Sequence, residues 1–218
     1  MPKTILTAVL VSAVAGLVCV GALAAKPATL RIVADDVVAS IEFERGVKVT
    51  LTSKPTPVRP DTYWTKSIRL SRKDDKGRTW ELRSTDVFGS LANVTVDAEQ
   101  EKVLLLGKPV GVIVEGKPAE DPPGVHVVSV SVKVVGISGE EFLPGAFLDG
   151  KMTLPNAAIK DEAGRVLASG RCEMREGRYG WFTWKHPPGW EGKFDVEVQV
   201  FMGPFEYRPG KTITPMKQ

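Results

Sequence analysis

The chain has 218 residues, of which 43% are hydrophobic and 25% are charged, so its composition is that of a folded protein with one large or two small domains. Its 29 basic and 26 acidic side chains give a net charge of +3, and the two signs are interspersed, which excludes the basic patch typical of a nucleic-acid-binding protein. The 21 glycines and 16 prolines favour many turns between short strands over long helices.

Residues 1–25 have the pattern of an export signal. Lys3 supplies a positive charge, and residues 5–25 are uncharged and mostly apolar. About 20 apolar residues also suffice to span a bilayer, so an uncleaved membrane anchor is the alternative. The Ala-Leu-Ala sequence of residues 22–24 is typical of a signal-peptide cleavage site and favours cleavage. In both cases we expect a secreted, periplasmic or cell-surface protein that contacts the membrane only through residues 1–25, if these are uncleaved.

Alternation of apolar and polar residues predicts a first β-sandwich domain over residues 28–117. The predicted strands form two hairpins, then a third strand pair and a final strand, at Ser40–Phe43 with Val47–Leu51, Thr65–Leu70 with Thr79–Arg83, Asn93–Val96 with Lys102–Leu106, and Val110–Val114. The prolines within residues 54–60 predict a surface loop or an edge crossing, because proline lacks the donor that a sheet ladder needs.

A linker is predicted at residues 118–124, which combine three prolines, a glycine and two adjacent acids. A second β-sandwich domain is predicted over residues 125–207, followed by a tail at 208–218. The clearest strand of this domain has valine at every second position from Val128 to Val134. Two further patterns predict a hairpin around residues 160–164 and a half-buried strand at 194–200.

Two of the predicted turns share one sequence pattern. Residues 73–78 (Lys-Asp-Asp-Lys-Gly-Arg) and residues 160–165 (Lys-Asp-Glu-Ala-Gly-Arg) both have Asp second, an acid third and Gly-Arg last. Duplication of a sandwich unit is one explanation. Convergence on a favourable turn is the other, since Asp and Gly are the residues that such reversals need.

The two halves resemble tandem immunoglobulin-like β-sandwich domains of secreted bacterial proteins, and the second half is also similar to macroglobulin-type repeats. In the second half the resemblance rests on Ile159, Asp161-x-x-Gly164-x-Val166-Leu167, Gly177, Pro187-Pro188 and Gly192-x-Phe194-x-Val196-x-Val198. In the first half it rests on Val94-x-Val96, residues 102–106 and Gly107-x-Pro109, which look like the closing strands of Ig-like or prealbumin-like domains. The paired cysteines and intervening tryptophan of true immunoglobulin domains are missing. The resemblance implies the fold and an extracytoplasmic setting, and it carries over no functional residue.

The sequence contains no recognisable catalytic or metal-binding motif. Its two histidines, His126 and His186, stand beside no signature nucleophile and at no metal-ligand spacing, so we predict no enzyme, no cofactor and no metal. The acidic pairs lie mostly in predicted turns, where Asp stabilises the reversal. Glycosidase chemistry and calcium binding are the alternatives for these carboxylates. Cys172 is expected to be a buried or edge thiol.

Five aromatic residues fall within residues 179–190 and supply the candidate ligand-binding site. On a strand, Tyr179 and Trp181 share one face, and Phe182 and Trp184 share the other. If the second pair points into the core, the first lies on the outer sheet face, where it could stack on a sugar ring or anchor a protein partner. The alternative is that other parts of the chain cover it. Tyr179, Trp181 and Trp190 form the predicted binding group.

We therefore predict an all-β protein with two antiparallel, Ig-like β-sandwich domains after an N-terminal signal or anchor helix. The predicted function is that of a non-catalytic binding or structural module of the cell envelope. One alternative is a carbohydrate-binding protein that uses an exposed aromatic face, and a second is an enzyme of unrecognised type. The expected partner is another envelope protein or a polysaccharide, and not a nucleic acid.

Overall fold

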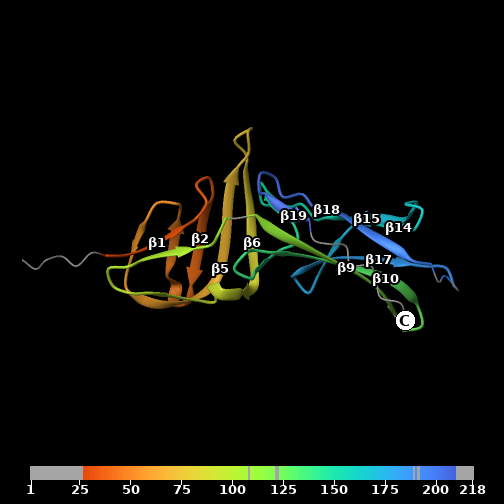
Figure 1. Cartoon of the computed structure of the whole chain (residues 1–218), viewed down its shortest axis with the longest axis horizontal. Coiled ribbons are helices and arrows are strands. Elements are labelled where there is room, and N and C mark those ends of the chain that lie inside the picture. The colour runs from red at the N-terminus through yellow and green to blue at the C-terminus, as the bar shows by residue number, and fades with distance from the viewer. Residues whose placement is uncertain (1–26, 108, 121–122, 189, 191, 210–218) are drawn as a thin grey trace, which may run out of the picture.

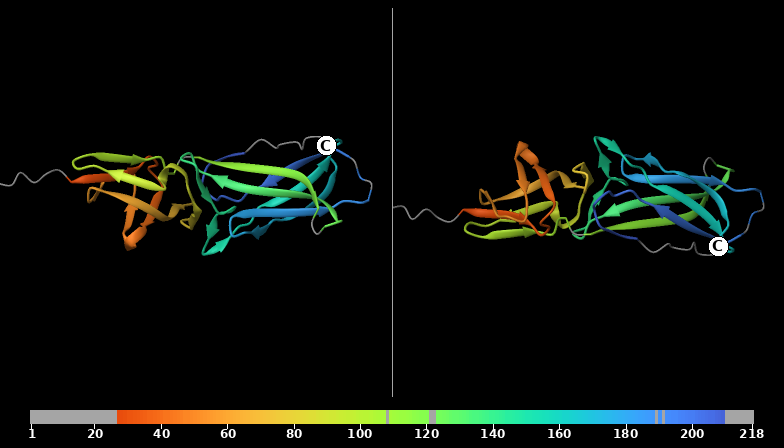
Figure 2. Two further views of the ribbon diagram at one scale, coloured as in Figure 1. Left: turned by 90° about the horizontal axis from the view of Figure 1, so that it is seen from below. Right: turned by 90° about the horizontal axis from the view of Figure 1, so that it is seen from above.

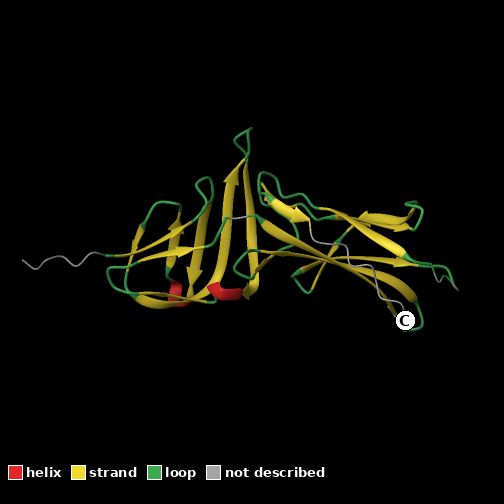
Figure 3. Cartoon of the chain, viewed as in Figure 1, coloured by secondary structure: helices red, strands yellow, loops and turns green. Residues whose placement is uncertain are grey.

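The computed structural model describes residues 27–107, 109–120, 123–188, 190 and 192–209. This part of the chain is all-β, with nineteen strands, two short 3-10 helices and no α-helix (Figure 3). The predicted fold class is confirmed at this level. The predicted signal or anchor helix at 1–25 lies outside the described residues, and within them no helix is both long enough and apolar enough to cross a membrane.

Eight strands and both 3-10 helices occupy the first half of the chain: β1 (Ala28–Ile32), β2 (Val38–Phe43), η1 (Glu44–Gly46), β3 (Lys48–Leu51), β4 (Thr56–Val58), β5 (Asp61–Lys73), β6 (Thr79–Phe88), η2 (Gly89–Leu91), β7 (Asn93–Val96) and β8 (Glu101–Leu104). Strands β3, β2, β5 and β6 are neighbours in one sheet, and β4, β1 and β8 form another. Both sheets contribute buried side chains to one apolar cluster. The predicted hairpins β2–β3 and β5–β6 are confirmed.

The predicted pairing of residues 93–96 with 102–106 is wrong. Strand β7 pairs with β5, whereas β8 pairs in parallel with β1, so the intervening residues carry the chain from one sheet to the other. Alternation locates a strand and its buried face, but it does not name the partner strand. The proline-rich segment at 54–60 contains β4, which pairs only with β1 and so tolerates Pro57 at a sheet edge.

Eleven strands occupy the second half: β9 (Val110–Glu120), β10 (His126–Val135), β11 (Glu140–Phe142), β12 (Phe147–Leu148), β13 (Lys151–Met152), β14 (Asn156–Asp161), β15 (Val166–Arg171), β16 (Glu173–Arg175), β17 (Tyr179–Lys185), β18 (Phe194–Gln199) and β19 (Tyr207–Pro209). Strands β9, β10, β17 and β16 are successive neighbours in one sheet, and β15, β14 and β18 form a separate one. The predicted β14–β15 hairpin and the alternating burial of β18 are confirmed.

The predicted linker at 118–124 falls within a hairpin. Strand β9 continues to Glu120 and pairs with β10 over ten successive residue pairs, from Gly111 opposite Val135 to Glu120 opposite His126. Residues 118–120 are therefore strand residues, because Pro118 needs no donor on the outer edge of β9. The predicted tail also begins within a strand, since β19 pairs in parallel with the start of β9. Residues 210–218 of that tail lie outside the described part.

The two halves are joined side by side along β6 in an elongated molecule (Figures 1 and 2). The three-residue strand β11 pairs with β6 on one side and with β10 on the other. Strand β12 also pairs with β6, and the guanidinium of Arg83 lies 4.0 Å from the ring centre of Phe147. An ion pair between Arg178 and Asp86 adds a polar contact across the same junction. The sheet of the first half therefore continues into the second through β11.

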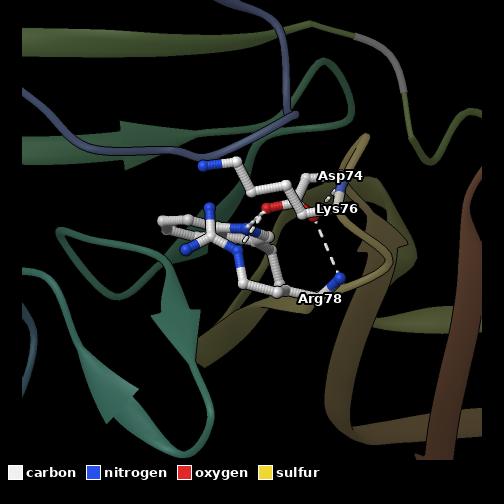
Figure 4. Close-up of polar contacts among 4 residues, drawn as sticks. Asp74, Lys76 and Arg78 are labelled. Carbon is white, nitrogen blue, oxygen red and sulfur yellow. Dashed lines mark hydrogen bonds and ion pairs between the residues drawn. The ribbon is translucent and has the colours of Figure 1, made fainter.

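The two turns with the shared sequence pattern have the same hydrogen bonds. In each, Oδ1 of the Asp accepts from the backbone N–H groups two and four residues later, at 3.0 and 2.9 Å, and the following Arg donates from Nε to Oδ2 at 2.8 Å. Figure 4 shows these contacts for the Asp74 turn. The glycines, Gly77 and Gly164, adopt φ of +75° and +76°, which a residue with a Cβ rarely does. The shared sequence pattern therefore forms the same hydrogen-bonded turn twice, as either duplication or convergence would give.

One contact distinguishes the two turns. The indole Nε1–H of Trp80 also donates to Oδ2 of Asp74, at 3.0 Å, and this bond is the largest of the causes that hold the pKa of Asp74 far below its ordinary range. In the other turn, the backbone N–H of Arg165 is the main cause of the lowered pKa of Asp161. The ring of Trp80 in turn lies against Gly203, where an added Cβ would overlap it. Asp74 thus ties the β5–β6 turn to the end of the second half.

We predict that Asp74→Ala lowers the urea midpoint of unfolding more than Asp161→Ala does. Both changes remove the same turn hydrogen bonds, but only the first leaves the indole N–H of Trp80 without its acceptor. The measurement is equilibrium unfolding followed by tryptophan fluorescence. Equal midpoints for the two variants would contradict a role for the Trp80 contact.

A buried carboxyl group lies where β11 meets β6. The side chain of Glu140 is only 2% exposed, its Oε2 accepts from the backbone N–H of Ser138 at 2.9 Å, and its carboxyl fits against Gly136, where a Cβ would overlap Oε1. Burial raises the pKa of Glu140 to about 7. The carboxyl group is therefore largely protonated in the folded protein at mildly acidic pH.

We predict that the stability of the protein falls as pH rises from about 4.5 to above 7. In this window the folded protein holds a proton on Glu140 that the unfolded chain releases, so raising the pH favours unfolding by up to about 3 kcal/mol, at about 1.4 kcal/mol per pKa unit. The variant Glu140→Gln stays neutral and should lose this dependence. Urea unfolding at pH 5 and pH 8 measures it, and parallel pH profiles for the two proteins would contradict the assignment.

Candidate functional site

Strand β17 divides its aromatic side chains between two environments. Phe182 and Trp184 pack against the apolar core, which leaves Tyr179 and Trp181 on the opposite face of the sheet. Both are partly exposed, and within the described part of the chain the sheet of β15, β14 and β18 lies on the opposite, core side of β17. These two predicted site residues therefore lie together on an outer surface.

Trp190, the third predicted site residue, lies elsewhere. Its ring contacts Trp184 edge-on, with ring centres 5.2 Å apart, and lies 6.0 Å from Phe194 and 5.3 Å from His186. These neighbours belong to the core side of β17 and to the end of the sheet. Because Trp190 follows the turn at Pro187 and is not a strand residue, alternation along β17 does not apply to it. The structure brings Tyr179 and Trp181 together and places Trp190 apart from them.

The surface around Trp181 is built from four neighbouring strands. Residues that pair directly across an antiparallel sheet share a face, so the register places Ser131 between Glu115 and Trp181, and Ser129 between Lys117 and Thr183. We call this surface the Trp181 face. Its members are Ile113, Glu115, Lys117, Ser129, Ser131, Lys133, Glu173, Arg175, Tyr179, Trp181, Thr183 and Lys185.

A hollow of about 170 Å³ lies in the middle of the Trp181 face. The residues that line it are Glu115, Lys117, Ser129, Ser131, Lys133, Tyr179 and Trp181. Two aromatic residues, two lysines, two serines and one glutamate therefore line one small volume. A hollow with apolar walls and a few directed polar groups is the usual form of a small binding site.

Ser129 supplies the least expected feature of this hollow. The residue is only 2% exposed, and its hydroxyl oxygen has no hydrogen-bond partner among the described residues. On the other face of β10, Val128 and Val130 are fully buried, so the strand holds the Ser129 side chain on the side of the hollow. A buried hydroxyl without a partner costs about 1–3 kcal/mol, so its retention is explained if a ligand supplies the partner.

Cationic groups lie over both aromatic rings of the Trp181 face. The Nζ atom of Lys133 is 4.7 Å from the ring centre of Tyr179, and the guanidinium carbon of Arg175 is 4.6 Å from that of Trp181. Each position lies within the range of a cation–π contact. The indole N–H of Trp181 donates to the hydroxyl of Thr183 at 3.0 Å, which holds the ring along the strand. The aromatic floor of the site is thus fixed in place before any ligand binds.

Sequence reasoning found the aromatic half of this hollow and missed the polar half. The valine alternation of β10 had placed Ser129, Ser131 and Lys133 on one face, which was the available signal. The pattern does not identify the strand that pairs with β10. Because residues 118–124 were interpreted as a linker, Glu115 and Lys117 were not expected beside β10.

The histidines and Cys172 lie outside this hollow. The ring centres of His126 and His186 are 6.0 Å apart at the end of the sheet, but within residues 27–107, 109–120, 123–188, 190 and 192–209 no three His, Cys, Asp or Glu residues are placed to hold a metal ion. Cys172 is buried, as predicted, and burial raises the pKa of its thiol to about 11. This thiol is therefore protonated and a poor nucleophile near neutral pH.

The chain matches no family model, no curated protein and no solved structure. The case for the Trp181 face rests on its own geometry.

We predict that Ser129→Ala stabilises the ligand-free protein by about 1 kcal/mol. The change removes a buried hydroxyl that lacks a partner and leaves the packing of β10 nearly unchanged. Urea unfolding of the variant measures the effect. The matched control is Ser131→Ala, whose hydroxyl lies on the same face but is only partly buried, and which should change stability by less than about 0.5 kcal/mol. A loss of stability in Ser129→Ala would show that the hydroxyl already has a partner.

Proposed function

We propose that this chain is an exported, non-catalytic binding module of the cell envelope, and that it binds polysaccharide through the Trp181 face. The export signal pattern of residues 1–25 supports the location. The observation that carries the binding proposal is the hollow at Trp181, where the buried Ser129 hydroxyl without a partner lies among aromatic side chains. A sugar offers both an apolar ring surface for the aromatic walls and hydroxyl groups for Ser129 and Ser131.

We further propose that the chain folds as two Ig-like β-sandwich domains, which are antiparallel except for the β1–β8 and β9–β19 pairs. The separate sheets β4-β1-β8 and β15-β14-β18 support one sandwich in each half, each against its part of the long sheet. In the second half, a Cβ on Gly116 of β9 would overlap Val196 of β18, so the two sheets approach closely there. With the β9–β10 hairpin intact, the boundary is better placed at residues 105–109, between β8 and β9, than at 118–124.

A binding module is favoured over an enzyme by the chemistry of the hollow. Glycoside hydrolysis requires two carboxyl groups on either side of the scissile bond, and Glu115 is the only carboxylate that lines the hollow among the described residues. Neither histidine lies there, and Cys172 is buried away from it. The groups that do converge are suited to holding a ligand by stacking and hydrogen bonds.

We predict that Trp181→Ala abolishes retention of the full chain on a polysaccharide that the unaltered protein binds. The change removes one wall of the hollow and the ring beneath the Arg175 guanidinium, so binding should weaken by at least about tenfold. The measurement is retention on a panel of soluble and insoluble polysaccharides by affinity electrophoresis and pull-down.

The matched control is Trp64→Ala. Trp64 is 53% exposed on β5 in the first half, so this variant removes an exposed tryptophan without touching the Trp181 face. It should bind as the unaltered protein does. Equal retention of both variants would overturn the assignment of the site, and failure of every polysaccharide on the panel to retain the unaltered chain would overturn the ligand class.

A further inference from the structure

Each aromatic ring of the Trp181 face has a cationic group over it. A neutral sugar that stacked on Tyr179 would have to displace the amine of Lys133, which lies over that ring. Stacking on Trp181 would likewise displace the guanidinium of Arg175. Each displacement gives up a cation–π contact. An anionic ligand avoids this loss, because its charged groups pair with the same cations where they already lie.

The charged residues of the whole Trp181 face also include more basic than acidic side chains. By the pairing register, four basic residues and three acidic residues lie on this face or directly beside it, namely Lys117, Lys133, Arg175 and Lys185 against Glu115, Glu173 and, opposite Val135, Glu141. The face therefore has a small excess of positive charge.

Only some of these charged residues line the hollow. Lys117 lies on β9 opposite Ser129, whereas Lys133 follows Ser129 and Ser131 along β10, and both lysines line the hollow. Among the described residues, Glu115 is the one carboxylate that also lines it, opposite Ser131. Two lysines beside two serines suit a repeating ligand whose acidic groups alternate with free hydroxyls. Glu115 is then an acceptor for one of those hydroxyls.

We propose that the ligand of the Trp181 face is an acidic polysaccharide, with its anionic groups on Lys117 and Lys133 and its hydroxyls on Ser129 and Glu115. This inference rests on the proposed function and adds the charge of the ligand to it. The aromatic rings hold the cations in place from beneath, so the binding site is preorganised for an anion. Recognition should therefore depend on salt, since exposed charge pairs are screened.

The test compares polygalacturonate with its fully methyl-esterified form, which has the same backbone without the charge. Isothermal titration of the full chain should show at least about tenfold tighter binding of the acidic form, the fold-change expected from one charge-assisted hydrogen bond. Raising the salt from 50 to 500 mM should remove most of this difference. Dextran sulfate against neutral dextran provides a second pair, which tells whether sulfate is accepted as well as carboxylate. A preference for the acidic member of either pair supports the proposal.

Single substitutions test which lysines bind the acidic polymer. Lys133→Met and Lys117→Met should each weaken binding of the acidic polymer about tenfold. The matched control is Lys102→Met, which removes an exposed lysine from β8 in the first half and should have no effect. Thermal unfolding of each variant verifies that it is folded, and two independent lysines keep the test valid if one variant fails to fold.

The contrary outcomes are distinct. Equal affinity for the acidic and neutral members of both pairs overturns the acidic ligand but leaves polysaccharide binding standing. Retention on some neutral polysaccharide of the panel, with no binding of either acidic polymer, has the same meaning. If Lys102→Met weakens binding as much as Lys133→Met does, the attraction belongs to the overall charge of the chain and the site assignment falls. If no polysaccharide binds at all, this inference and the proposed function fail together.

Discussion

The packing of β10 is the constraint on which both the fold and the candidate site depend. Its four alternate valines, Val128 to Val134, are fully buried, and burying a valine contributes roughly 1.5 kcal/mol or more. The strand pairs with β9 on one side and with β17 and β11 on the other, so its register is determined along its whole length. A shift by one residue would expose every valine and bury Lys133. The core side of β10 therefore dictates where its serines point.

The Trp181 face is a consequence of this arrangement. Because β10 is central, its outward residues are flanked on both sides by longer side chains from β9 and β17, and this is why Ser129 is buried on a face that no other sheet covers. The surrounding packing offsets the free-energy cost of the unpaired Ser129 hydroxyl. Strand β11 plays a comparable part at the junction, since three residues connect β6 to β10 and hold the buried carboxyl of Glu140 between them.

The sequence was most informative about strands and their faces. Period-two alternation located β10 and β18, and Asp-x-x-Gly-Arg located two turns that have the same hydrogen bonds, because these signals depend on residues close together in the chain. Partner strands depend on distant residues, so the pairings of β7 and β8 were missed. Residues 118–124 were predicted to be a linker, because a proline-rich sequence is found both in linkers and in strands at the outer edge of a sheet. Trp190 was grouped with Trp181 for nearness in sequence, although the turn between them carries it to the core side.

The polar half of the site was missed for the same reason, since it depends on which strands are neighbours. Tyr179 and Trp181 were identified from β17 alone, but a binding hollow requires groups from adjacent strands, and its amines and hydroxyls come from β9 and β10. The cations change the chemistry that the aromatic residues suggest. Exposed rings on a sheet favour stacking with a neutral sugar, whereas rings covered by Lys133 and Arg175 serve as supports that keep positive charge in place. The unpaired hydroxyl of Ser129 lies beneath this charged layer, so a ligand that reaches it must first be compatible with the cations above. An acidic polymer meets both requirements.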